Sequence, residues 1–504
     1  MKDKFSGQTN NGFSTLEIII AMAILILMFS SVIMISFGGQ SILTDNEAAI
    51  EALKKSQDLL EAEQSLSRKD FKLVNPRPRI QEGIFEKRVE VLTRPDNLTK
   101  EVTSIVEWAA ERGRTLNVSL TALVTNFENA IGGDTCNSVV TGQNWLTPQV
   151  STYAMNALSG ITGNFPVADV DVTNGMMYAA VNDSNDKTNP TLFVFDASTN
   201  PPTINGSDEN DKPASRTKEG INAIHAARNY VYAASAITAN FNTCPQSENC
   251  AQLQIFNVSN PSAPVLSKSF KLPNSLGASG SAYGKSIFYK EGYVYLGLAA
   301  AASGPEFNII DVRDLSNIRW IGGWPADNAV NEIYVKGKYA YVAVATATGQ
   351  ELFVLDISNP VTPVVVGGFD APSGGFGGFG KSMYSVGDTL YFGRTFDPSV
   401  TREEFYILDS TNPTSVFPIE GSRNMDESVN EIIVRDFLGF ILTNDNFRIF
   451  DISNPALISS IPPVFTMSLS EKSKTLECEG NALYIGSGET EGDAGTITIL
   501  KPGL

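Results

Sequence analysis

The chain has 504 residues, a net charge of −18, four cysteines and a single histidine. This length suits two or three domains, and the acidic balance argues against nucleic acid as a partner because phosphate binding needs a basic surface. With so few histidines and cysteines, a metal centre built from them or a His-dependent catalytic triad has little to work with. The many Val, Ile, Tyr and Phe residues favour a mainly β protein, and we expect neither a cofactor nor a metal.

An apolar run lies close to the N-terminus. Residues 18–37 carry no charge, and twenty residues make about 30 Å of helix, the thickness of a bilayer core. Directly before the run stands Glu17, whose insertion into a membrane costs ~2.5–3.5 kcal/mol and which is therefore expected to be functional. No small-residue cleavage site follows the run, as a secretory signal would require. Instead the sequence GFSTLE (12–17) precedes it, behind a leader that carries Lys2 and Lys4.

This arrangement resembles the class III signal of type IV pilins and of the pseudopilins of type II secretion. The resemblance implies that a prepilin peptidase cuts between Gly12 and Phe13 and methylates the new N-terminus. It also implies that other pilin subunits are partners, and that the chain is a single-pass protein of the inner membrane before it assembles into a surface filament. Glu17 would then pair with the α-amine of a neighbouring subunit, which is worth roughly 4 kcal/mol at an effective dielectric of 20. The plain alternative is a membrane anchor with an incidental glutamate.

The helix is expected to continue beyond the apolar run. Residues 45–70 are rich in Ala, Leu, Glu and Lys, with apolar residues at helical spacing, and NPRPR (75–79) ends the pattern. Three β-rich runs follow at 83–93, 99–110 and 114–127. We therefore divide this part into a leader (1–12), a long pilin-type assembly helix (13–72) and a small antiparallel sheet (73–135).

From about residue 150 the sequence repeats itself. Seven tight hairpins each precede a copy of one motif, as in LFVFDASTNPP (192–202), LQIFNVSNPSAP (253–264), LFVLDISNPVTP (352–363) and FRIFDISNPAL (447–457). Copies roughly 40 to 60 residues long that each supply four strands are typical of β-propeller blades. The motif resembles the LVIVD-repeat propellers, so we predict a seven-bladed propeller over 136–504, with a two-sheet sandwich as the alternative. The last copy lacks an outer strand, and QVSTYAMNAL (149–158) is the candidate to cover its edge.

Several residues are candidates for sites. Cys244 and Cys250 bracket a short loop, and Cys136 and Cys478 come together if the ring closes, so both pairs are predicted disulfides. Six expected inner strands begin with a polar residue in register, and Glu332 and Glu431 follow two of them. The six are Asn222, Lys285, Asn331, Lys381, Asn430 and Lys474. Such a ring would line one mouth of the channel and bind a ligand, although ordinary solvation of a wet channel explains it as well.

Other polar features have simpler readings. The acidic segments 183–189 and 208–211 offer oxygen atoms of the kind that Ca²⁺ uses, but without EF-hand spacing they are better read as solvated loops. His225 is expected to be a packed residue of an inner strand. The Gly-rich run 373–382 is expected to be a connection rather than a phosphate loop.

Two classes of function remain open. The first is a minor pilin-like or pseudopilin subunit that displays a propeller as a recognition or adhesion head for an unknown protein or glycan. The second is an enzyme displayed on a filament, a hydrolase or lyase, since some propellers are enzymes. No nucleophile and base stand out as a pair, which favours binding over catalysis. The sequence does not choose between a type IV pilus, type II secretion and a competence machine.

Overall fold

The computed structural model describes 22, 25–26, 28, 48–64, 66, 71, 74–94, 99–109, 114–125, 135–136, 144–182, 189–209, 220–236, 251–273, 276, 282–301, 303–346, 349–372, 379–399, 402–488 and 493–503. The chain divides into two compact units, Met1–Asn126 and Phe127–Leu504. Gly12, Phe13, Glu17, Cys244 and Cys250 lie outside the described residues.

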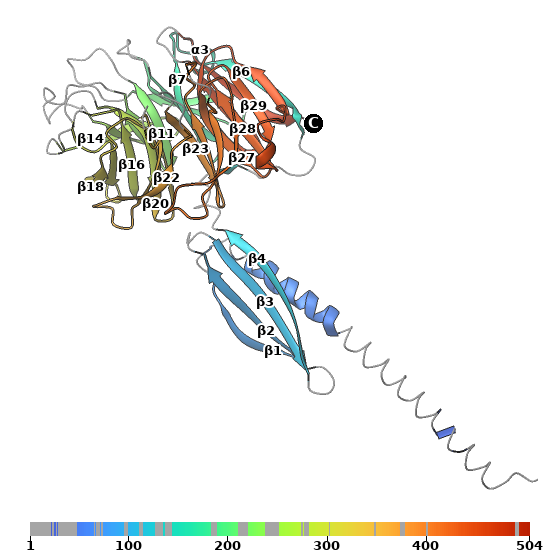
Figure 1. Cartoon of the computed structure of the whole chain (residues 1–504). Coiled ribbons are helices and arrows are strands. Elements are labelled where there is room, and N and C mark those ends of the chain that lie inside the picture. Colours follow the sequence, from blue (N-terminus) through green and yellow to red (C-terminus); the bar gives the residue numbers. More distant parts are fainter. Residues whose placement is uncertain are drawn as a thin grey trace, which may run out of the picture. The chain divides into compact units, whose positions relative to one another are not determined.

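The first unit is a helix packed on one sheet (Figure 1). The sheet is an antiparallel meander of β1 (Arg77–Glu82), β2 (Phe85–Thr93), β3 (Thr99–Ala109) and β4 (Thr115–Thr125). Residues 48–64 are helical, and Ala52 packs on Phe85, Val106 and Trp108 of the sheet. One polar bond crosses the same interface, because the hydroxyls of Ser56 and Ser104 lie 2.6 Å apart.

The predicted long pilin-type helix over 13–72 is wrong for the described chain. Continuous helix covers only 48–64, and the other two helices, α3 (Met155–Ser159) and η4 (Pro455–Leu457), are short. Beyond that stretch, Phe71 and Val74 lie in the core under the sheet. The ammonium of Lys100 donates to their carbonyl oxygens, at 3.0 and 2.6 Å.

The predicted single-pass membrane location is also corrected. Among the residues that the structure describes, no helix is both long enough and apolar enough to cross a membrane. Most of the apolar run 18–37 lies outside those residues.

The second unit is built from repeated antiparallel sheets, each listed here from its inner strand outward. The first three are β7 (Val167–Thr173), β8 (Met176–Val181), β9 (Leu192–Asp196), β10 (Thr203–Asp208); β11 (Ile221–Ala227), β12 (Tyr230–Ser235), β13 (Leu253–Asn257), β14 (Val265–Phe270); and β15 (Gly284–Lys290), β16 (Tyr293–Leu298), β17 (Phe307–Asp311), β18 (Arg319–Trp324).

The next three four-stranded sheets follow the same order. They are β19 (Val330–Lys336), β20 (Tyr339–Val344), β21 (Leu352–Asp356), β22 (Val364–Phe369); β23 (Gly380–Val386), β24 (Thr389–Arg394), β25 (Phe405–Asp409), β26 (Ile419–Arg423); and β27 (Val429–Arg435), β28 (Leu438–Thr443), β29 (Asn446–Asp451), β30 (Phe465–Ser468).

The last sheet joins distant parts of the chain. It has five strands in the order β5 (Thr135–Cys136), β31 (Ser473–Gly480), β32 (Ala482–Ser487), β33 (Thr496–Gly503) and β6 (Asn144–Ala154). β6 pairs antiparallel with β33, from Ala154 opposite Thr496 to Gln149 opposite Lys501. The prediction that residues near 149–158 cover the last edge is therefore confirmed, although the strand itself ends at Ala154 and α3 follows.

The sheets of the second unit form a closed ring. Each inner strand contacts the next inner strand along the chain, and β31 contacts β7. This arrangement fits a β-propeller. The predicted fold class is wrong in the number of sheets as well as in the long helix. The described chain has eight sheets rather than seven, and one of them, β1 to β4, belongs to the first unit.

Local turn chemistry repeats around the ring. Every inner hairpin turns in two residues, as in Thr173 opposite Met176, and φ is positive at turn residues such as Asn174 (53°) and Gly387 (58°). At the outer corners the Asp or Asn of the repeated motif accepts a bond from the backbone two residues on. Asp356 Oδ1, for example, lies 2.9 Å from the N–H of Ser358.

Neighbouring sheets meet at their outer strands through a glycine and a proline corner. A Cβ added to Gly367 would lie 2.4 Å from the carbonyl oxygen of Pro413 in the next sheet, and Gly322 meets that of Pro360 in the same way. The repeated Asn-Pro corner therefore packs on a glycine of the preceding sheet. Only a residue without a side chain fits this close approach.

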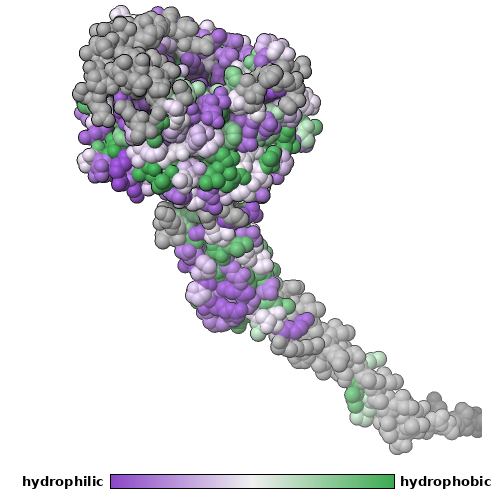
Figure 2. All heavy atoms as spheres, turned by 60° about the vertical axis from the view of Figure 1, so that its left-hand side comes forward, coloured by the Kyte–Doolittle hydropathy of each residue, from purple (hydrophilic) through white to green (hydrophobic). Residues whose placement is uncertain are grey.

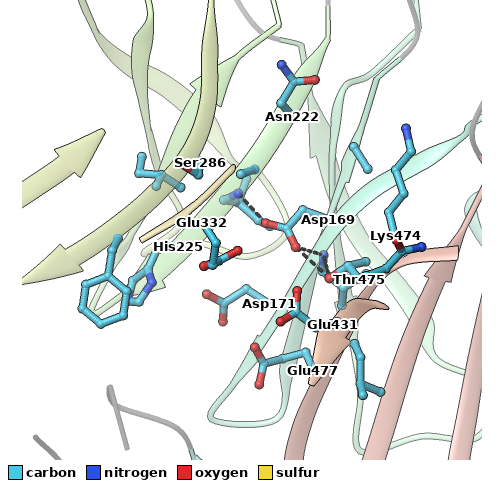
Figure 3. Close-up of a pocket in the computed structure, with 18 of the residues that line it drawn as sticks. Asp169, Asp171, Asn222, His225, Ser286, Glu332, Glu431, Lys474, Thr475 and Glu477 are labelled. Atoms are coloured by element: carbon cyan, nitrogen blue, oxygen red, sulfur yellow. Dashed lines mark hydrogen bonds between the residues drawn. The ribbon is translucent and has the colours of Figure 1, made fainter. Parts of the chain in front are cut away.

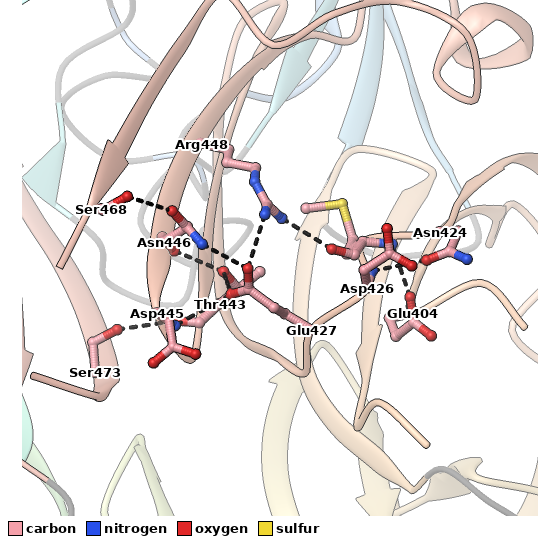
Figure 4. A network of polar contacts seen from close by, with 11 residues as sticks. Glu404, Asn424, Asp426, Glu427, Thr443, Asp445, Asn446, Arg448, Ser468 and Ser473 are labelled. Carbon is pink, nitrogen blue, oxygen red and sulfur yellow. Dashed lines mark hydrogen bonds and ion pairs between the residues drawn. The ribbon is translucent and has the colours of Figure 1, made fainter. Parts of the chain in front are cut away.

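Buried polar residues hold the loops that join one sheet to the next. The carboxylate of Glu427 accepts bonds from Thr443 Oγ1 (2.5 Å), Asn446 Nδ2 (2.6 Å) and Arg448 Nη2 (2.9 Å), as Figure 4 shows. These bonds lower the pKa of Glu427 despite its partial burial. The network is fully paired and has a structural role.

Candidate functional site

The inner strands share one alignment, which the backbone register defines. Each of the strands has a register irregularity between its first and third residue, so its second residue is an extra one opposite its partner. The second residues are Ala168, Asn222, Lys285, Asn331, Lys381, Asn430 and Lys474, and all of them line a central cavity of about 1100 Å³. The six predicted mouth residues thus lie in one layer; their binding role stays a prediction.

The three asparagines of this layer tie neighbouring sheets together. Asn222 Nδ2 donates to the carbonyl of Gly284 at 2.7 Å, and Asn331 Nδ2 donates to that of Gly380 at 2.5 Å. Asn430 Nδ2 donates to the carbonyl of Ser473. In each case the acceptor is the first residue of the next inner strand. The asparagines therefore have a structural role.

The three lysines alternate with the asparagines around the ring. In the strands that carry them, a hydroxyl at the third position makes the bond to the next sheet. Ser286 Oγ donates to Val330 O at 3.0 Å, and Ser382 Oγ donates to Val429 O at the same distance. Burial lowers the pKa of Lys285. The lysines stay candidates for ligand binding at this mouth.

A layer of carboxylates lies next to the mouth layer. Asp169, Glu332 and Glu431 occupy the third position of their strands, and Figure 3 shows the side chains of Glu332 and Glu431 directed toward the same space as Asp171 and Glu477. Asp169 accepts bonds from the N–H of Ile224 (2.7 Å) and from Thr475 Oγ1 (2.7 Å). The acidic groups therefore come from strands spread around the ring.

Burial dominates the electrostatics of these carboxylates. It raises the pKa of Asp169 to about 6, against the opposing effect of its hydrogen bonds. Burial together with the charge of Asp169 raises the pKa of Glu332 to about 8. The pKa of Glu431 is raised well above its usual value by burial and by the charges of Glu332 and Asp169. No cation is among the causes, so the group repels itself.

The fifth position makes a two-sided layer. One side is aromatic: His225, Phe288, Tyr334 and Tyr384 follow one another on β11, β15, β19 and β23, and the His225 and Phe288 rings lie 5.0 Å apart. The other side carries Glu477 on β31 and Asp171 on β7, whose Oδ2 accepts the N–H of Ala226 at 2.6 Å. Burial lowers the pKa of His225 to about 4, so its ring is neutral. His225 is packed, as expected.

Sequence reasoning missed Asp169, Asp171 and Glu477. The alignment that found the mouth residues relied on a polar side chain at the second position, and β7 has Ala168 there. The alternation of VADVDVT, with acids two residues apart, was the available signal.

The structure describes the cysteines of one of the two predicted disulfides, Cys136 and Cys478. Cys478 is disulfide-bonded, and Arg435 Nη2 donates to its sulfur at 2.9 Å. β5 runs parallel to β31 and places Cys136 opposite Gly480, which is the backbone approach that the predicted Cys136–Cys478 pair needs. That pairing stays a prediction. Within the described residues no group of three His, Cys, Asp or Glu side chains could hold a metal ion.

One of three comparisons with known proteins identifies the repeat. The LVIVD repeat family matches residues 249–271 and 329–371, so the chain carries LVIVD repeats. A comparison with curated protein sequences finds no match for this chain. Among solved structures, the Pan2 WD40 domain of Neurospora crassa is 7% identical with a TM-score of 0.44, covering 73% of this chain and 98% of that one. BamB from Moraxella catarrhalis is 14% identical with a TM-score of 0.37, covering 70% and 97%.

Proposed function

We propose that this chain is a recognition protein whose ring binds a small ligand in its central cavity, without catalysing a reaction. The observation that carries the proposal is the cavity itself. About 1100 Å³ is enclosed at the centre of the ring, and every inner strand contributes charged, amide or aromatic side chains to its lining. A concave site with a few converging polar groups is the usual place for a ligand.

The lining favours binding over catalysis. The one histidine of the chain, His225, is neutral and faces aromatic rings. The serine hydroxyls at the third position, Ser286 and Ser382, donate to backbone carbonyls and bridge sheets. These two hydroxyls are therefore used for the bonds between sheets.

The proposed setting is a type IV pilus-like filament, in which the chain is a minor pilin-like or pseudopilin subunit. The GFSTLE sequence at 12–17 supports this setting, with a prepilin peptidase and other pilin subunits as partners. We expect mass spectrometry of the assembled form to find an N-terminus at Phe13. We also expect Glu17→Ala to reduce incorporation into filaments. Retention of residues 1–12 in filaments would contradict the proposal.

Thermal-shift measurements on the full chain test the recognition role. The ligands are three sets of small molecules that are cationic, anionic or neutral, and the variants are Lys285→Gln and Glu332→Gln, with the exposed Glu209→Gln as the matched control. We expect one set to raise the melting temperature, and one cavity variant to remove that effect. Absence of any shift, or chemical turnover of a ligand that binds, would contradict the proposal.

A further inference from the structure

The two sides of the fifth layer suggest the chemistry of the ligand. Phe288 and Tyr334 line one side of the cavity with aromatic side chains, while Asp171 and Glu477 line it with carboxylates. Aromatic rings and carboxylates together attract organic cations, because the face of a π-system carries negative potential. On this layer itself an anion meets no cationic side chain, whereas Lys285, Lys381 and Lys474 line the mouth layer of the same cavity.

The carboxylates of the third layer have no cationic partner in the part of the chain that the structure describes. Asp169 accepts from two backbone amides and one hydroxyl, and Glu431 accepts from the N–H of Ile432 at a long 3.4 Å. A buried carboxylate that is paired only with neutral donors gains strongly from an ammonium group. Burial and mutual repulsion raise the pKa of Glu332 and Glu431, which agrees with a missing positive charge.

One buried acceptor beside these acids also has no donor. Asn430 is only 5% exposed and lines the cavity, and its Oδ1 has no hydrogen-bond partner while its Nδ2 is fully used. A buried acceptor without a donor costs about 1–3 kcal/mol. Because this oxygen has less than 1 Å² of exposed surface, a ligand with N–H groups relieves the cost when the Asn430 side chain turns toward the cavity, whereas a quaternary ammonium has no hydrogen to donate.

We propose that the cavity binds a linear alkyl polyamine, with its ammonium groups on the carboxylates of Asp169, Glu332 and Glu431 and its methylene groups along the aromatic wall. This assignment rests on the proposed recognition role of the cavity. The carboxylates stand on β7, β19 and β27, around the ring rather than around one point, which suits several separated charges. The absence of any three-residue metal group in the described residues agrees with an extended cation.

Isothermal titration of the full chain with spermidine tests the assignment. We expect saturable binding that weakens at least about a hundredfold in the Glu332→Gln/Glu431→Gln variant, since two charged hydrogen bonds are lost. Glutamine keeps the size of the side chain and, like the protonated acid that the raised pKa favours in the free protein, carries no charge, so the fold is retained, and the melting temperature verifies this. Glu209→Gln is the control and is expected to bind as the wild type.

Two further titrations separate the possible failures. 1,4-Butanediol, which has the same kind of chain without charge, is expected not to bind. Unchanged affinity of the double variant for spermidine, or no binding of spermidine at millimolar concentration, would overturn the polyamine assignment. If adipate binds instead and Lys285→Gln abolishes that binding, the recognition role stands and the cationic ligand is refuted. If none of these probes binds and the thermal-shift sets have no effect, both proposals are refuted.

Discussion

Inner strands that carry asparagine and inner strands that carry lysine are bonded to the next inner strand through different side chains. On five of these strands a side chain donates to the first carbonyl of the next inner strand, whereas on β31 Thr475 Oγ1 donates to the carboxylate of Asp169. β11, β19 and β27 use the amide of the second residue, whereas β15 and β23 use the hydroxyl of the third residue. The alternation of Asn and Lys around the ring is therefore an alternation of joints.

The choice of joint decides which side chain is left for the cavity. Where the asparagine makes the hydrogen bond to the next inner strand, the third residue is not needed for that bond. On β19 and β27 this third residue is Glu332 or Glu431. Where serine makes the joint, the second residue is released, and it is a lysine. The carboxylate layer and the lysine layer thus follow from how the sheets are joined. The alternation breaks at β7, which follows a lysine strand and precedes an asparagine strand, and Ala168 stands there.

The largest expected effect is on stability against pH. A carboxyl whose pKa is higher in the folded state binds its proton more tightly there, so stability is lost as pH rises from the unfolded value, near 4.5, to about 8 for Glu332. At ~1.4 kcal/mol per pKa unit the loss is about 2–4 kcal/mol. Urea unfolding at pH 5 and pH 8 measures it. Glu332→Gln is expected to flatten the dependence and Glu209→Gln to leave it, and equal slopes in all three proteins would contradict this account.

The next effect concerns the glycine opposite each joint serine. Gly393 pairs with Ser382, and a Cβ there would lie 2.2 Å from Ser382 Oγ and 2.6 Å from Val429 Cγ1. We expect Gly393→Ala to cost about 3 kcal/mol, from crowding and from a weakened bond to Val429 O. The Ser382→Ala/Gly393→Ala pair should cost less than the sum of the two single changes. Strict additivity in urea unfolding would show that the serine and glycine are not coupled.

Replacing an asparagine that bonds two inner strands is expected to cost less stability. Asn331→Ala leaves the carbonyl of Gly380 without its donor, which costs about 1–3 kcal/mol. The urea midpoint measures the change, and Asn331→Asp is a useful second variant because it keeps the size but has no amide N–H. If both variants unfold at the wild-type midpoint, the amide is not part of the joint.

Much of the ring could be predicted from the sequence because its determinants are local. Two-residue turns recur with each copy and Asn-Pro corners with five of the seven. The open edge of the last copy required a strand from elsewhere, which β6 supplies. The polar residues at the second position aligned correctly because the bulge recurs in every inner strand. Asp169 and Asp171 did not follow from that alignment, since β7 lacks the polar residue on which it depended.

The N-terminal part was predicted less well. Helical spacing over 45–70 was read as one element with the apolar run, but among the described residues continuous helix covers only 48–64, and Phe71 packs under the sheet, where Lys100 donates to its carbonyl oxygen. A tertiary contact between residues 29 positions apart has no signature in local periodicity. The hydrogen bonds between neighbouring sheets could not be predicted for the same reason, because the carbonyl that faces the next strand is determined by the closed ring. On the face of the second unit seen in Figure 2, apolar residues form separate patches among polar ones.

The smallest expected effect on stability is that of replacing a lysine of the mouth layer. Lys285 stands at the same strand position as Asn331, but the carbonyl of Val330 in the next sheet is already bonded to Ser286 Oγ. Lys285→Ala is therefore expected to change stability by less than about 0.5 kcal/mol, since burial already disfavours the charge of this lysine. Urea midpoints of Lys285→Ala and Asn331→Ala, measured side by side, compare the two joints directly. An equal loss of stability in Lys285→Ala and Asn331→Ala would mean that both residues stabilise the ring alike. The lysines of the mouth layer would then not be available to a ligand.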